Sequence, residues 1–343
     1  MAAANPGTTL PTQFPWIING TEAADFINGN SSSEFIYGNG GSDNLFGNGG
    51  NDTIYGGTGD DLLNGGNGND LLVGGAGNDR FFSGSGYDTV SYQTSNSRVV
   101  VDMVGGVNNI LSDATGDTYN SIEFIVGTQF DDQFILSDEG VVVDAGAGHD
   151  LIRGGAGSDV MYGGAGNDRL DGEGGADYLF GGNGNDRING DSGDDFMLGG
   201  DGNDDLDGGD GNDIIDGGAG NDTLEGGLNN DILTGDVGDD FLDGGHGSDT
   251  MTGGAGRDTV SLWTSSRPGP TGDHITDFVS GEDILQLGTQ GSLYVGVAPW
   301  TSNALYSYNP LTGALYIDVG GQDKLVAIFD NRPTLSISDF SFV

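Results

Sequence analysis

The sequence predicts an all-β protein: a right-handed parallel β-roll, a solenoid similar to a β-helix, with two repeat blocks and a C-terminal β cap. Three observations lead to this prediction. Acidic residues recur every nine positions, glycines precede each acid in fixed phase, and an apolar residue follows each acid by two positions. Such a period is typical of stacked repeats. Because 34% of the residues are hydrophobic and recur regularly, a packed chain is favoured over plain disorder.

The repeat has the consensus G-G-x-G-x-D-x-U-x, where U is an apolar residue. Residues 74–79 and 217–222 are two of its copies. The acids keep a step of nine from Asp25 to Asp88 and again from Asp150 to Asp258. A run of solvated charges would show no such phase, so the acids belong to a repeating structural unit.

The consensus can be translated into a coil. Glycine is required where the backbone takes a positive φ or approaches an ion closely, so G-G-x-G-x-D predicts a turn. The residues x-U-x predict a short strand in which only U points inward, because strand side chains alternate between faces. Two repeats then form one coil, and residues 18 apart lie above one another. Connections between parallel strands are right-handed, which sets the expected handedness.

The charges of this coil predict a cation. Carboxylates on stacked strands lie about 4.8 Å apart and repel by roughly 3–4 kcal/mol at an effective dielectric near 20. With Ca²⁺–oxygen distances of about 2.3–2.6 Å, one ion can bridge adjacent coils, and turn carbonyls complete its coordination; Mg²⁺ fits less well. One U side chain per strand makes a thin core for so many glycines. We therefore predict multiple Ca²⁺ ions as cofactors and folding coupled to their binding.

The candidate calcium ligands are the acids of the complete repeats. They are Asp43, Asp52, Asp61, Asp70, Asp79, Asp88, Asp150, Asp159, Asp168, Asp177, Asp186, Asp195, Asp204, Asp213, Asp222, Asp231, Asp240, Asp249 and Asp258. Asp25 and Glu34 lie in turns that lack the third glycine. We interpret these two turns as an N-terminal cap, with weak metal binding or none.

Three departures from the consensus change the expectation at single turns. Val141 replaces an acid in phase, so that site is expected to be lost, and Asp132 is doubtful because Phe130 stands where glycine is expected. Asn229 replaces a glycine before Asp231. Because asparagine tolerates positive φ, this last turn is expected to survive.

The consensus closely resembles that of the RTX family, the repeats-in-toxin or haemolysin-type calcium-binding repeats, over roughly residues 20–92 and 127–262. Residues 120–132 resemble an insertion found inside RTX arrays. Residues 273–285 look like the segment that closes RTX rolls in serralysin-type secreted proteins, and residues 335–343 resemble the uncleaved C-terminal signal of type I secretion substrates. The resemblance implies calcium binding, an extracellular location and passage through the type I secretion machinery.

Charge and composition exclude several classes of protein. With 53 acidic and 9 basic residues the formal net charge is −44, which excludes ordinary nucleic-acid binding and adhesion to anionic lipid. The absence of cysteine excludes disulfides and thiolate metal sites. No apolar run approaches the ~18 residues of a membrane span. Residues 1–20 have neither the positive charge nor the apolar core of a secretory signal peptide, so an export signal is expected elsewhere.

Five segments are expected along the chain. They are an N-terminal extension at 1–19, a first RTX β-roll block at 20–92, a β-rich insertion at 93–131, a second block at 132–262, and a C-terminal β cap with the secretion signal at 263–343. Phase is lost between Asp88 and Asp132, because their separation of 44 is not a multiple of nine. We interpret the insertion as a β-bulge that splices two rolls; a lateral binding surface is the alternative.

The C-terminal segment is rich in aromatic residues and contains a hairpin signal. The strand expected at 315–319 follows a Pro-Leu-Thr-Gly turn. Core packing is expected for the aromatic side chains, with glycan binding as the alternative. These residues are Trp263, Tyr294, Trp300, Tyr306, Tyr308 and Tyr316.

No enzyme is expected. The sequence has no H-E-x-x-H and no G-x-S-x-G motif, and His149, His246 and His274 are expected to be spacers or structural. We predict a secreted structural, surface or matrix protein that binds calcium. The alternative is an extracellular enzyme or a glycan-binding adhesin that acts through the C-terminal aromatic region, with a cell-surface or matrix polysaccharide as partner.

Overall fold

The computed structural model describes residues 16–104, 113–262, 272–287, 293–295, 306–318 and 323–342. The chain divides into two compact units, Met1–Val126 and Gly127–Val343. Every described element is a β-strand except one 3-10 turn, η1 (Ile337–Asp339). The predicted all-β parallel roll is therefore confirmed. Within the part of the chain that the structure describes, no helix reaches the length and apolarity that crossing a membrane requires.

Unit 1 is a two-layered roll of parallel strands. One layer has the order β1, β3, β5, β7, β9, β12, and the other has the order β2, β4, β6, β8, β11. The strands of residues 16–128 are β1 (Trp16–Asn19), β2 (Phe26–Asn28), β3 (Glu34–Gly40), β4 (Asn44–Gly49), β5 (Thr53–Thr58), β6 (Leu62–Asn67), β7 (Leu71–Ala76), β8 (Arg80–Ser85), β9 (Thr89–Ser91), β10 (Val100–Asp102), β11 (Thr118–Asn120) and β12 (Phe124–Thr128).

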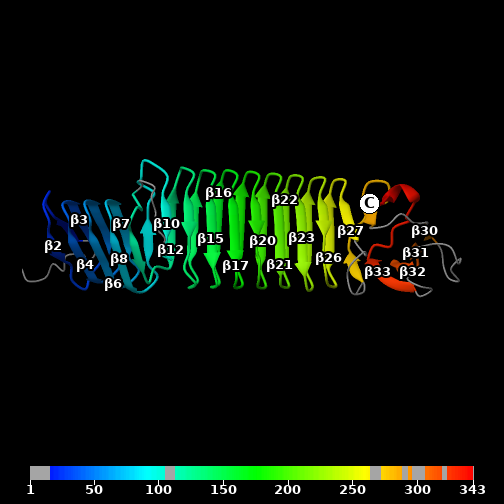
Figure 1. The fold of residues 1–343 in the computed structure, drawn as a ribbon, viewed down its shortest axis with the longest axis horizontal. Coiled ribbons are helices and arrows are strands. Elements are labelled where there is room, and N and C mark those ends of the chain that lie inside the picture. The colour runs from blue at the N-terminus through cyan, green and yellow to red at the C-terminus, as the bar shows by residue number, and fades with distance from the viewer. Residues whose placement is uncertain are drawn as a thin grey trace, which may run out of the picture. The chain divides into compact units, whose positions relative to one another are not determined.

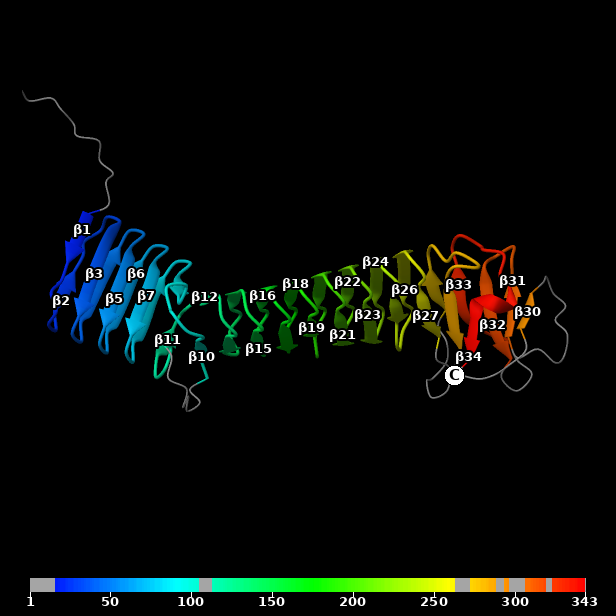
Figure 2. The same ribbon diagram turned by 90° about the horizontal axis from the view of Figure 1, so that it is seen from above.

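Unit 2 repeats this arrangement with more coils. Its even-numbered strands β14 to β28 form one layer and its odd-numbered strands β13 to β29 the other, as Figure 1 shows from the side and Figure 2 from above. The strands are β13 (Gln133–Ile135), β14 (Val142–Gly146), β15 (Leu151–Gly155), β16 (Val160–Ala165), β17 (Arg169–Glu173), β18 (Tyr178–Asn183), β19 (Arg187–Asn189), β20 (Phe196–Asp201), β21 (Asp205–Asp210), β22 (Ile214–Ala219), β23 (Thr223–Leu228), β24 (Ile232–Val237), β25 (Phe241–Asp243), β26 (Thr250–Ala255), β27 (Thr259–Leu262), β28 (Asp273–Ile275) and β29 (Ile284–Leu287).

The register between neighbouring strands is 18 residues in both repeat blocks. In unit 2, Ile188 pairs with Leu206, and Leu206 pairs with Leu224. The apolar U residues therefore stack directly above one another in the interior. In unit 2 these positions are 0–2% exposed. They are Ile152, Met161, Leu170, Leu179, Ile188, Met197, Leu206, Ile215, Leu224, Leu233, Leu242, Met251 and Val260.

The strands are longer than the sequence predicted. The expected strand x-U-x has three residues, whereas β22 covers the six residues Ile214–Ala219, which include the glycine pair of the next repeat. Gly200 pairs with Gly218, and Gly218 pairs with Asp236. The glycines thus continue the pairing between stacked strands, because a backbone without Cβ atoms can still pair while it bends toward the turn.

The loss of phase between the repeat blocks follows from unequal connections. β11 pairs with β8 at a separation of 38 residues, as in Thr118 and Arg80. β12 pairs with β9 at a separation of 35, as in Phe124 and Thr89. The extra chain enters after β9, and the half-coil between β11 and β12 is shorter than nine residues. Both strands nevertheless return to the two layers of unit 1.

The C-terminal region adds strands to both layers of unit 2. β33 (Asp323–Phe329) pairs in parallel with β28, and β34 (Phe340–Phe342) pairs in parallel with β29. The predicted hairpin is confirmed: β31 (Tyr306–Asn309) and β32 (Ala314–Asp318) run antiparallel around the Pro-Leu-Thr-Gly turn. β30 (Leu293–Val295) pairs with β31. Trp263, Trp300, Val319, Val343 and the N-terminal residues 1–15 lie outside the described residues.

A cavity in the U stack should weaken the loaded roll. Leu206 is 0% exposed, so we expect Leu206→Ala to lower the free energy of unfolding by about 2–5 kcal/mol. The measurement is urea denaturation in excess Ca²⁺. Val237→Ala is the control, because Val237 is 60% exposed and its truncation should change stability by less than about 0.5 kcal/mol. Equal effects of the two substitutions would contradict the stacked core.

Candidate calcium-binding ladders

All nineteen predicted ligands lie inside the turns. Each is at most 3% exposed, from Asp79 at 0% to Asp204 at 3%. Each follows the turn glycines and directly precedes a strand, so the carboxylate points back under its own turn. Burying an ionised carboxylate is costly unless it is paired or bonded. The hydrogen bonds that its two oxygens accept therefore decide whether the carboxylate can also bind a cation.

The first oxygen, Oδ1, is bonded to the backbone of the neighbouring coil. Asp186 N–H donates to Oδ1 of Asp204 over 2.8 Å, and Asp204 N–H donates to Oδ1 of Asp222 over 2.8 Å. The same bond recurs at a separation of 18 residues along both edges of the repeat blocks. We call these rows of acids the carboxylate ladders. They link successive coils through the acids themselves.

The second oxygen, Oδ2, is buried without a hydrogen-bond partner in most ladder acids. The acids with this orphaned oxygen include Asp43, Asp52, Asp61, Asp70, Asp79, Asp88, Asp150, Asp168, Asp177, Asp186, Asp195, Asp204, Asp213, Asp222, Asp231, Asp240 and Asp258. A buried polar atom of this kind requires an explanation, such as an ion. Because it repeats in nearly every consensus turn, the explanation must belong to the repeat.

Backbone oxygens converge on the same place. A Cβ built on Gly226 would lie 2.5 Å from Oδ2 of Asp231 and 2.5 Å from the carbonyl oxygen of Gly244, one coil further on. The first glycine of the repeat is therefore needed because a side chain would fill this cradle. Carboxylate and carbonyl oxygens are the donors that Ca²⁺ prefers. Among the described residues no three His, Asp or Glu side chains are grouped to hold a metal, so a cation held here would need further donors, which the turn carbonyl oxygens can supply.

Burial shifts the acids toward the protonated form when no cation is present. Burial raises the pKa of Asp79, Asp204 and Asp231 from 3.8 to about 7; the backbone N–H bond to Oδ1 opposes this, and the stacked carboxylates add to it. Asp61 and Asp70 rise to about 6 for the same leading reason. A bound dication would favour the ionised form instead.

Some ladder positions were not predicted as ligands. Asp117 accepts the N–H of Asp79 over 2.6 Å, and Glu123 accepts that of Asp88 over 3.0 Å. Asp273 and Asp283 continue the ladders beyond the last repeats, accepting from Asp249 and Asp258 over 3.2 and 3.1 Å. These four acids lie outside the nine-residue phase. The sequence pattern that could have identified them is an acid followed two positions later by an apolar residue, as in Asp117-Thr118-Tyr119.

The turns that departed from the consensus still contribute to the ladders. Asp25 and Glu34 donate their N–H groups to Oδ1 of Asp43 and Asp52 over 2.7 and 2.8 Å. Val141 N–H donates to Oδ1 of Asp159 over 2.8 Å. Val141 itself has no carboxylate that could accept an N–H from another coil. Asn229 has a φ of 77°, so its turn survives as predicted. His149 stands in an exposed turn, where its Nδ1 accepts the N–H of Asn167 over 2.7 Å.

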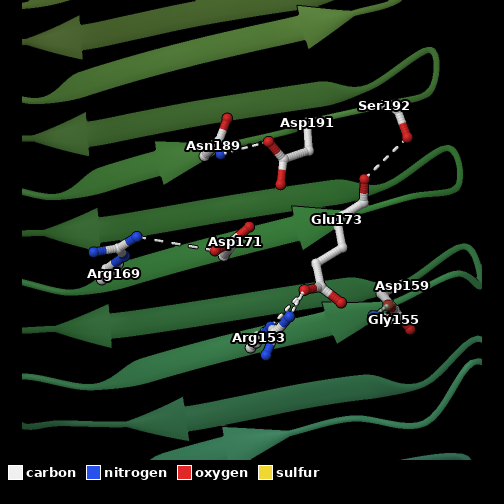
Figure 3. A network of polar contacts seen from close by, with 9 residues as sticks. All are labelled: Arg153, Gly155, Asp159, Arg169, Asp171, Glu173, Asn189, Asp191 and Ser192. Atoms are coloured by element: carbon white, nitrogen blue, oxygen red, sulfur yellow. Dashed lines mark hydrogen bonds and ion pairs between the residues drawn. The ribbon is translucent and has the colours of Figure 1, made fainter.

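The arginines on the outer face of β15, β17 and β19 pair with acids outside the ladders. Figure 3 shows Arg153 beside Glu173 and Arg169 beside Asp171. Arg187 lies 3.4 Å from Asp205. All three arginine side chains are more than half exposed, so these ion pairs add little stability. They balance charge on the surface, while the ladder carboxylates lie in the turns.

The fold and the two rows of buried, half-bonded carboxylates define a calcium-binding β-roll protein. The family model of the RTX calcium-binding nonapeptide repeat (4 copies) matches residues 17–90 and 142–260 in overlapping segments, more than half of the chain. The chain belongs to this family. No curated protein is significantly similar to it in sequence.

The pKa shifts predict how the metal-free chain responds to pH. A carboxyl whose pKa rises from 3.8 unfolded to about 6–7 in the roll stabilises the roll below pH ~4, and this contribution is lost as the pH rises through 6–7. In excess chelator we therefore expect more β-structure at pH 4 than at pH 8, measured by far-UV circular dichroism. Asp204→Asn should reduce this pH dependence more than Asp205→Asn, because Asp205 is exposed. A chelated chain that loses β-structure on acidification would contradict the shifts.

Proposed function

We propose that this protein is a secreted scaffold that folds when Ca²⁺ fills its carboxylate ladders. The observation that carries the proposal is the buried, orphaned Oδ2 repeated from turn to turn beside a carbonyl oxygen of the next coil. The ligands are the aspartates of the consensus turns, and Ca²⁺ supplies the positive charge that holds adjacent coils together when it is bound. The acids would hold it through the orphaned Oδ2, and the carbonyl oxygens beside Oδ2 would be further donors.

Charge supports the coupling of folding to calcium. The chain carries 53 acidic and 9 basic residues, so a metal-free roll would gather many like charges in two narrow ladders. The core that opposes this repulsion has one U side chain per strand, and glycine, which loses the most conformational entropy on folding, makes up 69 of 343 residues. A ligand that binds the folded form stabilises it by mass action. Folding is therefore expected to follow calcium binding.

Location outside the cell fits the same chemistry. RTX repeat proteins are typically secreted, and extracellular calcium modules work at dissociation constants of about 10⁻⁴–10⁻³ M. The chain would cross the type I secretion machinery unfolded, with residues 335–343 as the signal, and would fold where Ca²⁺ is abundant. In the roll, β34 pairs with β29. The secretion machinery would therefore have to recognise this segment before the two strands pair.

The proposed role is structural and includes no catalytic step. A surface or matrix component is favoured, because nearly all described elements belong to the solenoid or its cap. Glycan binding through the C-terminal tyrosines is less favoured. Tyr306 and Tyr308 are 0% exposed, and the Tyr308 hydroxyl donates to the Pro333 carbonyl over 3.0 Å. Buried rings cannot stack on a sugar.

A calcium titration tests the proposed function directly. We expect the purified chain in chelator at pH 8 to lack most β-signal and to gain it cooperatively as Ca²⁺ rises to about 10 mM, because ion binding is linked to folding. Far-UV circular dichroism measures the change, and Mg²⁺ is the control ion. A roll that is complete in chelator, or a chain still unfolded at saturating Ca²⁺, would refute the proposal.

Substitutions of two neighbouring acids distinguish Ca²⁺ binding by a ladder carboxylate from a general effect of negative charge. Asp204 is 3% exposed with an orphaned Oδ2, whereas Asp205 is exposed on the outer face. We expect Asp204→Ala to raise the Ca²⁺ midpoint of folding, because a lost site removes about 2.7 kcal/mol of stabilisation at free Ca²⁺ 100 times its Kd. Asp205→Ala removes the same charge and should leave the midpoint nearly unchanged. Equal midpoints for both variants would count against the ladder as the binding element.

A further inference from the structure

The turns of the ladders fall into two classes, which differ at the residue four positions before the acid. Where Oδ2 is orphaned, this residue has a positive φ: Gly200 before Asp204 has +114° and Gly218 before Asp222 has +100°. The rule does not require glycine. Glu173 before Asp177 has a φ of 66°, and Asn39, Asn48, Asp191 and Asp236 also take positive φ at this position.

In the second class the same residue is not left-handed, and its N–H bonds the acid. Thr21 N–H donates to Oδ2 of Asp25 over 2.6 Å, and Thr128 N–H donates to Oδ2 of Asp132 over 2.6 Å. Asn30 does the same to Oε2 of Glu34 over 3.0 Å, and Val279 to Oδ2 of Asp283 over 2.6 Å. We call these self-capped turns. None of these four donor residues has a positive φ.

The backbone angle explains the difference. Changing φ from negative to positive turns the N–H of this residue to another side of the chain, so it either faces the carboxylate or leaves it bare. An N–H bond to a carboxylate is charge-assisted and strong. A cation that approached a self-capped Oδ2 would meet an oxygen that is already bonded and an N–H dipole of the wrong sign. A bare Oδ2 beside a carbonyl oxygen has the opposite preference.

Asp159 shows that sequence alone does not assign the class. Its turn, residues 154–159, has all three consensus glycines. Gly155 is nevertheless not left-handed, and its N–H donates to Oδ2 of Asp159 over 3.3 Å, the pair drawn in Figure 3. One coil further on, Glu173 takes positive φ without being glycine, and Oδ2 of Asp177 is orphaned.

Four of the self-capped turns flank the consensus repeats of the two units. Asp25 and Glu34 occupy the first turns of unit 1, Asp132 begins the ladder of unit 2, and Asp283 follows its last repeat. At the other end of unit 1 a hydroxyl takes the role of the N–H. Tyr92 Oη donates to Oδ2 of Asp117 over 2.7 Å. At each of these turns the second carboxylate oxygen is thus bonded by one of the protein's own donors.

We propose that the backbone angle of the residue four positions before each ladder acid decides whether the turn takes a cation. Positive φ makes a cation-binding turn, and any other angle makes a self-capped turn that closes the ladder without metal. This assignment rests on the proposed calcium function and deepens it. It removes Asp159 from the calcium ligands and keeps Asp25, Glu34, Asp117, Asp132 and Asp283 outside them.

The first test changes the class of a single turn. Gly218→Thr should lose at least one bound Ca²⁺, because threonine, which is β-branched, disfavours positive φ. Gly218→Asn is the matched control and should keep the wild-type number, since asparagine is left-handed at Asn39 and Asn48. Bound Ca²⁺ per chain is measured by equilibrium dialysis.

The second test removes acids from the two classes. Asp132→Ala and Asp159→Ala should leave the number of bound ions unchanged, whereas Asp168→Ala should lower it. Loss of ions in the first two variants, or equal numbers for Gly218→Thr and Gly218→Asn, would overturn the assignment. A wild-type chain that binds no Ca²⁺ would overturn the proposed function itself, so the two failures are distinguishable. Circular dichroism at saturating Ca²⁺ identifies any variant that has not folded, and the comparison of Asp159→Ala with Asp168→Ala then decides.

Discussion

The structure depends on a buried carboxylate that, in most consensus turns, has one oxygen hydrogen-bonded and the other without a hydrogen-bond donor. Oδ1 accepts the N–H of the acid one coil earlier, as in Asp186 and Asp204, and this joins coil to coil. Oδ2 has no protein donor in most consensus turns, as at Asp204, and burial raises the pKa of this acid. The fold thus buries carboxylates whose negative charge has to be neutralised. Protons neutralise it at low pH, and a dication can do so at neutral pH.

The other features of the repeat follow from the burial of this charged carboxylate. The first glycine leaves room for the carboxylate, since a Cβ on Gly226 would crowd Oδ2 of Asp231. The second position takes the positive φ that turns its N–H away from the acid. The U residue fills the interior between the two layers and is as buried as the acids. These three positions of the consensus therefore either leave space for the ion or pack the strand that precedes it.

The sequence predicted the class of fold and the members of the ladders well, because both follow from a strict period. It failed where the period fails. Asp117 and Asp283 hold ladder positions, yet unequal connections move them out of phase. The sequence also placed the glycine pairs in turns, whereas they extend the strands. Strand length depends on pairing with the coils on either side, which the local pattern does not contain.

By itself the sequence determined the 18-residue register, the inward U stack, the two rows of acids and the preference for a hard dication, because residue spacing and charge are written in it directly. The tertiary structure decided which oxygens are already bonded. Residues 154–159 and 217–222 share the consensus glycines, but Gly155 gives its N–H to Asp159 while Gly218 is left-handed and leaves Asp222 bare. That difference is a backbone angle set by the neighbouring coils, and glycine permits either value.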